Sequence, residues 1–167
     1  SDVCSSDLAA IAKVCTERKV GLIEDFSQCN GGAVAGRKLG SWGDVAVTSL
    51  QLNKVITAGE GGLFLTSNPD YYEKAVARSD MGYPRSGGVA SAEKAAGFVT
   101  VGEGRRYNEV SAAIMRAQLG KLDTIVKAMR ASKQAIEGAI KPTVPCRMRA
   151  VVDPAGDLGS TSTILFD

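Results

Sequence analysis

The sequence contains no histidine and a single tryptophan among 167 residues, and aromatic residues make up only 5% of it. Without histidine, Ser-His and Cys-His catalysis and most zinc sites are excluded. No apolar run approaches the length of a membrane-spanning helix. The net charge is only +2, so no charge excess favours nucleic acid or an anionic membrane as a partner.

Cysteine is also scarce, with four residues that form no CxxC pair and have no regular spacing (Cys4, Cys15, Cys29 and Cys146). This pattern is typical of reduced thiols, so we expect a cytoplasmic protein without a disulfide framework. Hydrophobic residues make up 44% of the chain and charged residues 23%, which is ordinary for a soluble globular protein. The length is sufficient for one domain with a real core.

Both ends of the chain look cut. Residues 1–8 read as the translation of a common sequencing-adapter oligonucleotide, and we expect this segment to be artefactual. The alternative is a genuine polar N-terminus with a helix cap at Ser6 or Asp7. The last residues, 164–167, end inside a run that is typical of a strand. We therefore expect the chain to be a piece of a larger protein.

Short apolar runs alternate with helical patterns along the chain. Strands are predicted at 19–24, 45–50, 63–66, 147–152 and 163–166. Helices are predicted at 9–18, 70–79 and 108–139, and loops at 25–43 and 81–104. Asn68 and Asn108 are the expected N-caps, and Gly120 is expected to bend or divide the last helix. The alternation predicts an α/β fold with a mainly parallel sheet.

Lys54 has the most informative surroundings in the chain. It lies between the apolar run that ends at Ser49 and the turn-forming glycines of Gly59-Glu-Gly-Gly62. Asp25 and Ser49 each come at the end of a predicted strand, and sites in parallel sheets gather at those ends. The same residues have plainer explanations, namely a surface lysine, a turn carboxylate and a strand hydroxyl.

These residue types meet the needs of pyridoxal phosphate (PLP). The cofactor requires an amine that forms an imine with it, a carboxylate that keeps its pyridinium nitrogen protonated, and hydroxyl or N–H groups around its phosphate. Lys54, Asp25 and Ser49 supply one each. Gln28 supplies a donor for the ring hydroxyl. Neither the cysteines nor any other group suggests a metal site.

Four blocks in a fixed order resemble the sugar aminotransferases of the DegT/StrS group. They cover nearly everything from Ala9 to about Ala139. The blocks are Ile23-Glu-Asp25-x-x-Gln28, Gly40-Ser-x-Gly-Asp44, Ser49-x4-Lys54-x4-Gly59-Glu-Gly-Gly62, and Arg106-Tyr-Asn108-Glu109 continuing to Leu122. The resemblance implies the fold-type-I, three-layer α/β/α large domain of PLP transferases, related to aspartate aminotransferase.

The resemblance also implies a domain organisation. Residues 9–140 would form part of the PLP-binding large domain, including the start of the long inter-domain helix. Pro142 and Pro145 would end that helix and mark a boundary. Residues 141–167 would begin a small α+β C-terminal domain.

Roles carry over residue by residue. Lys54 matches the lysine that forms the Schiff base and moves the proton between the substrate α-carbon and the cofactor C4′ carbon. Asp25 matches the pyridinium partner, Gln28 the residue near the ring oxygen, and Ser49 a phosphate ligand. Lys54 also separates the chain from the dehydratase branch of the group, in which a histidine replaces the lysine.

The chain departs from the group at three places. Gly104-Arg105-Arg106 replaces a usual Asn-Tyr-Arg run, whose asparagine reaches the cofactor phosphate of the partner subunit. A charged contact from Arg106, or from Arg105, is the expected substitute. Asn30 replaces a frequent histidine, and Leu50 replaces the usual aromatic after the phosphate serine.

The implied activity is transfer of an amino group from glutamate or glutamine to a keto-sugar, free or nucleotide-linked, in polysaccharide, cell-surface-sugar or antibiotic-sugar biosynthesis. A homodimer with shared sites is implied too. One alternative is a non-catalytic PLP-binding or regulatory homologue, or an inactive fragment. A generic nucleotide-binding domain would need G-x-G-x-x-G, and the run from Gly102 lacks the final glycine.

Overall fold

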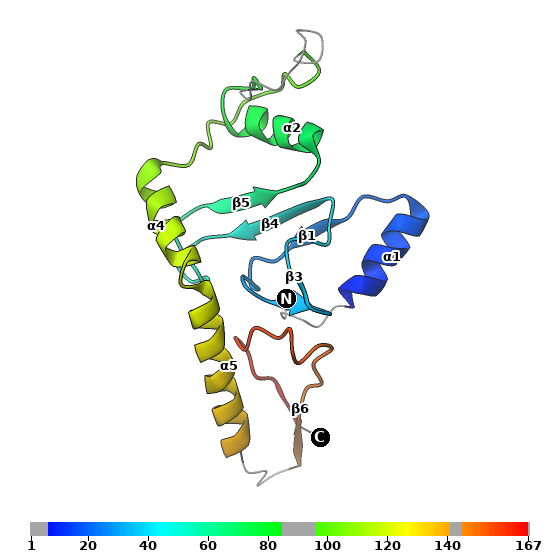
Figure 1. Ribbon diagram of the computed structural model, residues 1–167, viewed down its shortest axis with the longest axis vertical. Coiled ribbons are helices and arrows are strands. Elements are labelled where there is room, and N and C mark those ends of the chain that lie inside the picture. Colours follow the sequence, from blue (N-terminus) through cyan, green and yellow to red (C-terminus); the bar gives the residue numbers. More distant parts are fainter. Residues whose placement is uncertain (1–6, 85–95, 141–144, 167) are drawn as a thin grey trace.

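The computed structural model describes residues 7–84, 96–140 and 145–166. Its helices are α1 (Leu8–Arg18), α2 (Pro69–Ser79), α4 (Glu109–Leu119) and α5 (Leu122–Ala139). Its strands are β1 (Ile23–Asp25), β2 (Ala33–Val34), β3 (Arg37–Lys38), β4 (Val45–Ser49), β5 (Gly62–Leu65), β6 (Cys146–Met148) and β7 (Ile164–Phe166). Figure 1 shows α4 and α5 following one another along one side of the molecule, with α1 on the other side of the central sheet.

The central sheet has the strand order β1-β4-β5. β1 and β4 are parallel, with Ile23 opposite Val45 and Asp25 opposite Val47. β5 runs antiparallel to β4 and places Gly62 opposite Ser49. The connection between β4 and β5 contains no helix. Parallel neighbouring strands are usually joined by a crossover helix, so a direct connection is consistent with the antiparallel direction of β5. The predicted α/β class is confirmed, and the sheet is mixed.

Side-chain caps define where the helices begin. The Asp7 carboxylate accepts a hydrogen bond from the Ala10 N–H at 3.0 Å. Asn68 accepts from the N–H groups of Asp70 and Tyr71, and Asn108 accepts from that of Ser111. The two asparagine caps are therefore confirmed. Of the predicted adapter-derived segment 1–8, residues 1–6 lie outside the described residues, and the adapter origin of the segment stays a prediction.

The strand predicted from Lys19 starts later than expected. Lys19 adopts a left-handed conformation, with φ of 54°, and its N–H bonds the carbonyls of Cys15 and Thr16. A left-handed residue at this position is a helix C-cap, here occupied by lysine in place of the usual glycine. The chain must then turn before pairing, so β1 begins only at Ile23.

The predicted loop 25–43 contains a short hairpin. β2 and β3 pair antiparallel, with Val34 opposite Arg37. The two turn residues between them, Ala35 and Gly36, have φ of 49° and 76°. Positive φ at both positions is typical of a type I′ hairpin turn, for which Asn-Gly is the strong signal and Ala-Gly a weak one.

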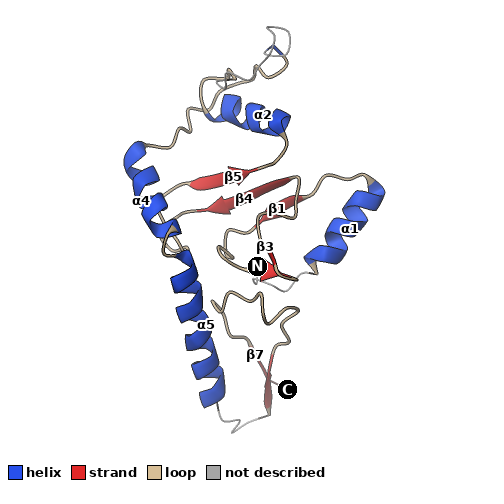
Figure 2. Cartoon of the chain, viewed as in Figure 1, coloured by secondary structure: helices blue, strands red, loops and turns tan. Residues whose placement is uncertain are grey.

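The long predicted helix is divided at Gly120, as expected. α4 ends at Leu119 and α5 begins at Leu122. Pro142 and residues 85–95 of the predicted 81–104 loop lie outside the described residues. Figure 2 shows that much of residues 145–166 is loop. The strands β6 and β7 on either side of this loop are both shorter than predicted. Within the described part of the chain, no helix is both long and apolar enough to cross a bilayer.

Two small apolar clusters join the segment between β4 and β5 to the helices α4 and α5. The first contains Leu50, Ile56, Ala58 and Met115, with Leu122 and Ile125 against it. The second contains Val126 and Leu158, and packs on side chains that include Val55 and Leu122. Leu122 therefore contacts both. The segment between β4 and β5, which carries Lys54, is therefore packed against these helices.

Candidate functional site

Asp25 and Ser49 are the last residues of the neighbouring parallel strands β1 and β4. The sequence expectation that both lie at one edge of the sheet is confirmed. Side chains alternate along a strand, so Glu24 and Asp25 point to opposite faces. The Glu24 carboxylate is buried and accepts hydrogen bonds from the N–H groups of Gly40 at 2.6 Å and Trp42 at 3.0 Å. Asp25 is exposed on the other face.

The Asp25 carboxylate is held by Ser27. One oxygen, Oδ1, accepts from the Ser27 hydroxyl at 2.6 Å and from the Ser27 N–H at 3.0 Å. These two bonds lower the pKa of Asp25 and outweigh the opposing effect of burial, and the positive charge of Lys54 adds a lesser lowering. Because hydrogen bonds to an ionised carboxylate favour that form, Asp25 is an anion near neutral pH.

Ser49 is tied to the same group. Its N–H donates to the Ser27 hydroxyl oxygen at 3.1 Å, and its own hydroxyl accepts from the Gln51 N–H at 3.3 Å. The buried Asn30 side chain donates to the Ser49 carbonyl at 3.4 Å and accepts from the Thr48 hydroxyl at 2.7 Å. Asn30 thus anchors the end of β4 to the loop after β1.

Lys54 lies in the connection 50–61, which we call the lysine loop. The loop is closed at its base, where the Leu50 N–H donates to the Gly61 carbonyl at 2.8 Å and the Ala58 N–H to the Leu50 carbonyl at 3.0 Å. The Lys54 N–H donates to the Gln51 carbonyl at 2.9 Å. Leu50 is fully buried, so it anchors the base of this loop.

The Lys54 ammonium is electrostatically coupled to Asp25 and is available for a ligand. Its charge is one of the causes that lower the Asp25 pKa. Across residues 7–84, 96–140 and 145–166, no hydrogen bond or ion pair engages its Nζ. The lysine also lines a hollow of about 390 Å³ with Gln28, Asn53, Val55, Met129, Ser160 and Thr161. The structure therefore brings together Asp25, Gln28, Ser49 and Lys54.

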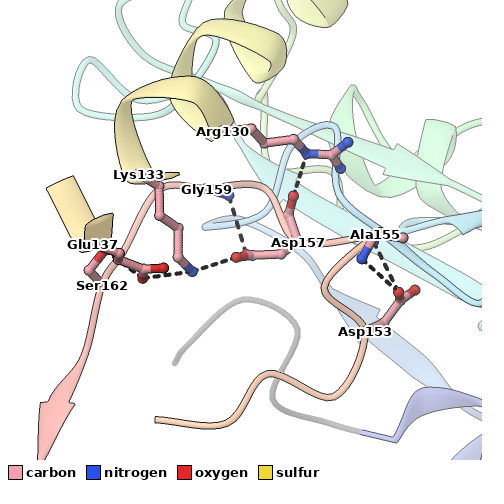
Figure 3. A network of polar contacts seen from close by, with 9 residues as sticks. Arg130, Lys133, Glu137, Asp153, Ala155, Asp157, Gly159 and Ser162 are labelled. Atoms are coloured by element: carbon pink, nitrogen blue, oxygen red, sulfur yellow. Dashed lines mark hydrogen bonds and ion pairs between the residues drawn. The ribbon is translucent and has the colours of Figure 1, made fainter. Parts of the chain in front are cut away.

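A C-terminal segment closes one side of this hollow. Ser160 and Thr161 line it, and they follow residues that are clamped to α5. Figure 3 shows the clamp, in which Asp157 lies between Arg130 and Lys133. Arg130 Nε donates to the Asp157 carbonyl at 2.5 Å, and Lys133 Nζ lies 2.5 Å from Asp157 Oδ2. Sequence patterns gave no sign of this wall.

The same segment also contacts the hairpin. The Ala35 N–H donates to Asp153 Oδ2 at 2.8 Å, and the Ala33 N–H donates to the Gly156 carbonyl at 3.0 Å. Asp153 further accepts from the N–H groups of Ala155 and Gly156. Residues 153–157 are therefore hydrogen-bonded to the β2–β3 hairpin, which lies between β1 and β4 in the sequence.

Arg106 is engaged elsewhere. Its Nε lies 3.2 Å from Oδ1 of Asp80, the buried C-cap of α2. Arg105 pairs with Glu103 at 2.5 Å, and Glu103 also pairs with Arg78. No contact among the described residues connects Arg106 to Lys54 or Asp25. A role for Arg106 at a cofactor phosphate stays a prediction.

The residues at the sheet edge fit PLP. Asp25 is anionic and its second oxygen, Oδ2, carries no hydrogen bond within the described residues, which suits a protonated ring nitrogen. Lys54 supplies an amine, and Ser49 supplies a hydroxyl. A larger hollow of about 660 Å³ lies beside α2, between apolar side chains such as Phe64 and Phe98, and it is lined by neither Lys54 nor Asp25. No cluster of metal ligands occurs in the described residues.

Solved structures share this fold. An aminotransferase, TlmJ, from Streptoalloteichus hindustanus superposes with a TM-score of 0.81 at 27% identity, over 97% of this chain and 43% of that one. An E. coli GDP-4-keto-6-deoxy-D-mannose-3-dehydratase with bound hydrated PLP superposes with a TM-score of 0.82 at 20% identity, over 99% of this chain and 46% of that one. At that identity the second likeness shows the fold alone. Together they confirm the expected fold type I of PLP transferases.

Curated relatives match the same part of the sequence. A 3-amino-5-hydroxybenzoate synthase of Amycolatopsis mediterranei (strain S699) is 33% identical over 71% of this chain and 29% of its own length. A GDP-perosamine synthase of Vibrio cholerae is 34% identical over 74% and 32%. An L-glutamine:2-deoxy-scyllo-inosose aminotransferase of Streptomyces kanamyceticus is 32% identical over 71% and 28%.

The model of the DegT/DnrJ/EryC1/StrS aminotransferase family matches residues 3–150. The chain belongs to this family, which confirms the resemblance found in the sequence. It spans about a third of the length of the curated relatives, from 28% to 32% of each. Activity, substrates and partners of the whole protein are therefore matters for proposal.

Sequence reasoning missed Ser27 as a site residue. A weak signal was available, because Asp25 and Ser27 have the spacing at which an aspartate side chain bonds the backbone N–H two residues later. The second bond, from the hydroxyl, and the third, from Ser49, depend on how β1 and β4 pair. No local pattern encodes that pairing.

Proposed function

We propose that this chain is the cofactor-binding part of a PLP-dependent aminotransferase that transfers an amino group from glutamate or glutamine to a keto-sugar, nucleotide-linked or free. The observation that carries the proposal is the anionic Asp25, which ends one of two parallel strands and lies within electrostatic reach of the unengaged amine of Lys54. When bound, PLP supplies the electron sink that makes the substrate α-carbon acidic.

The chain's own residues would do the rest. Asp25 holds the proton on the ring nitrogen because its ionised carboxylate is stabilised by Ser27. Lys54 Nζ would hold the cofactor covalently, and would then take the proton from the α-carbon of the amino donor and deliver it to the C4′ carbon of the cofactor. Ser49 offers its hydroxyl to the phosphate, and Gln28 offers its amide to the ring oxygen. Arg106 pairs with Asp80 through Nε, so a phosphate would be met by its remaining N–H groups.

The substrate class is supported by two relatives. The GDP-perosamine synthase is named for a nucleotide-linked amino sugar, and the inosose aminotransferase for L-glutamine and a cyclic polyol ketone. A wall that includes the hydroxyl side chains Ser160 and Thr161 faces the Lys54 hollow, and hydroxyl groups suit a polyol substrate. The proposal places the enzyme in the biosynthesis of polysaccharides, cell-surface sugars or antibiotic sugars.

The proposal includes a homodimer and a cytoplasmic location. Arg105 and Arg106 lie in an exposed stretch, where a second subunit could complete a site. Cys15, Cys29 and Cys146 form no disulfide among the described residues, which suits a reducing compartment.

Absorbance with added PLP tests the cofactor site. We expect a visible band that is lost in Lys54→Ala and kept in Lys127→Ala, a matched change of an exposed lysine on α5. After borohydride, peptide mapping should find the cofactor on Lys54. A band of equal strength in Lys54→Ala would overturn the assignment.

A second candidate is a non-catalytic PLP-binding homologue, which the replacement of the usual asparagine by Gly104 favours. Single-turnover amino transfer separates the two. An enzyme preloaded with PLP releases 2-oxoglutarate from glutamate and retains the amino group, whereas a binding protein releases none. Release at the level of the Lys54→Ala variant would favour the second candidate.

A further inference from the structure

One hydroxyl, that of Ser27, joins the ends of the two parallel strands. It donates to Asp25 Oδ1 at 2.6 Å and accepts from the Ser49 N–H at 3.1 Å. Asp25 ends β1 and Ser49 ends β4, so the bridge links the carboxylate expected at the cofactor ring to the residue expected at its phosphate. Ser27 itself is half-buried.

The direction of the bridge is fixed by chemistry. The Ser49 N–H can only donate, so the Ser27 oxygen must accept there. The Ser27 hydroxyl proton is therefore donated to Asp25 Oδ1. Oδ1 can accept this hydrogen bond only while it carries no proton of its own. The chain of donors runs from Ser49 through Ser27 to an ionised Asp25, and protonation at Oδ1 would break it.

The bridge also decides which oxygen of Asp25 remains for a ligand. Both bonds from Ser27, from its hydroxyl and from its N–H, end on Oδ1. Oδ2 has no hydrogen bond within the part of the chain that the structure describes. A carboxylate that is fixed through one oxygen presents its other oxygen in a restricted direction. Its side chain therefore loses less conformational entropy when a ring N–H binds to it.

We propose that Ser27 is a positioning residue of the cofactor site, which holds Asp25 ionised and reserves its Oδ2 for the ring nitrogen while it fixes the end of β4 at Ser49. The inference rests on the proposed function for the identity of the ligand. It concerns Ser27 alone, and Asp25 remains the group that would touch the cofactor.

The first test needs no cofactor and uses the carboxyl ¹³C signal of Asp25 in the purified chain. In the wild type the pKa should lie below the ordinary aspartate range. Ser27→Ala should move it up toward that range, and Ser27→Thr, which keeps a hydroxyl, should restore the low value. Ser79→Ala is the matched control, because Ser79 is also half-buried but bonds only the Val76 carbonyl in α2.

An unchanged Asp25 titration in Ser27→Ala would overturn the inference, as would an equal shift in Ser79→Ala. Amide spectra report whether each of the three variants is folded. If Ser27→Ala does not fold, the titration of Asp25 in Ser27→Thr decides the test. The threonine variant must then titrate like the wild type.

The second test is PLP affinity, measured by absorbance. Losing a hydrogen bond to a charged group should weaken binding by about tenfold or more in Ser27→Ala. Ser27→Thr should remain close to the wild type. If the wild type binds no PLP, the proposed function fails, while the titration of Asp25 still decides whether Ser27 holds it. If PLP binds equally to the wild type and Ser27→Ala, the positioning role fails alone.

Discussion

Lys133 Nζ lies 2.5 Å from Asp157 Oδ2, and both side chains are only 13% exposed. The pair joins α5 to the segment that precedes Ser160 and Thr161, so it fixes one wall of the Lys54 hollow. Asp157 Oδ1 also accepts from the Gly159 N–H at 3.2 Å, and Arg130 holds the Asp157 carbonyl. The clamp therefore fixes both the side chain and the backbone of this segment (Figure 3).

Breaking this pair from one side should be costly. Lys133→Met leaves a nearly buried carboxylate without its cation, and we expect a loss of about 3 kcal/mol in the free energy of unfolding. Urea denaturation measures it. Lys13→Met is the control, because Lys13 and Glu17 form an exposed pair at 3.9 Å in α1, where the loss should stay below about 0.5 kcal/mol. Equal losses in the two variants would contradict a structural role for the clamp.

Leu50 should be the main apolar anchor of the lysine loop. It is 0% exposed, whereas Leu52, two residues further along the loop, is 67% exposed. Leu50→Ala should therefore lower the free energy of unfolding by about 2–5 kcal/mol, since it opens a cavity beside Ile56 and Met115. Leu52→Ala should change it by less than about 0.5 kcal/mol. The comparison isolates burial, because both substitutions remove the same atoms from the same loop.

Asp25 should make the stability of the fold depend on acid pH. Its pKa is lowered mainly by the two hydrogen bonds from Ser27, so folding favours the ionised form. The stabilisation is present above the ordinary aspartate pKa of about 3.9 and is lost as the pH falls through the folded value. In unfolding experiments, the advantage of the wild type over Asp25→Asn should be largest near neutrality and shrink below about pH 4. A pH-independent difference would contradict the bonding of Asp25 by Ser27.

Gly104 should tolerate asparagine. Its φ is 62°, and a side chain added there would meet no atom within 4 Å. Asparagine adopts left-handed conformations more readily than most residues, so Gly104→Asn should change the free energy of unfolding by less than about 1 kcal/mol. Gly104→Val has the same space but a strained backbone, with a loss of about 1–2 kcal/mol or more. If both variants are equally stable, backbone conformation does not explain this glycine.

The parts of the fold that local chemistry controls were predictable from the sequence. Asn68 and Asn108 cap helices because a short amide reaches the first free N–H groups, whatever the rest of the chain does. Gly120 divides the long helix, and Asp25 and Ser49 end strands, as their flanking patterns indicate. Four of the five predicted site residues come together on this basis: Asp25, Gln28, Ser49 and Lys54.

The rest depends on partners distant in sequence. The reversed direction of β5 follows from how the lysine loop closes on Leu50, and the β2–β3 hairpin has a weak Ala-Gly turn. Arg106 pairs with Asp80, a residue far from it in the sequence, and no local pattern indicates this pairing. The Ser27 bridge needs the pairing of β1 with β4, and the Asp157 clamp needs a chain that returns to α5.

The lysine loop and the clamped segment come from separate stretches of the chain. The groups proposed for acid–base chemistry all lie between Asp25 and Lys54, while Ser160 and Thr161 arrive from beyond α5. Mutations around residue 160 can therefore alter what the hollow accommodates without disturbing the Ser27 bridge or the anchoring of Leu50. Such a separation would allow acceptor specificity to change while the residues of the proposed amino-transfer chemistry are retained.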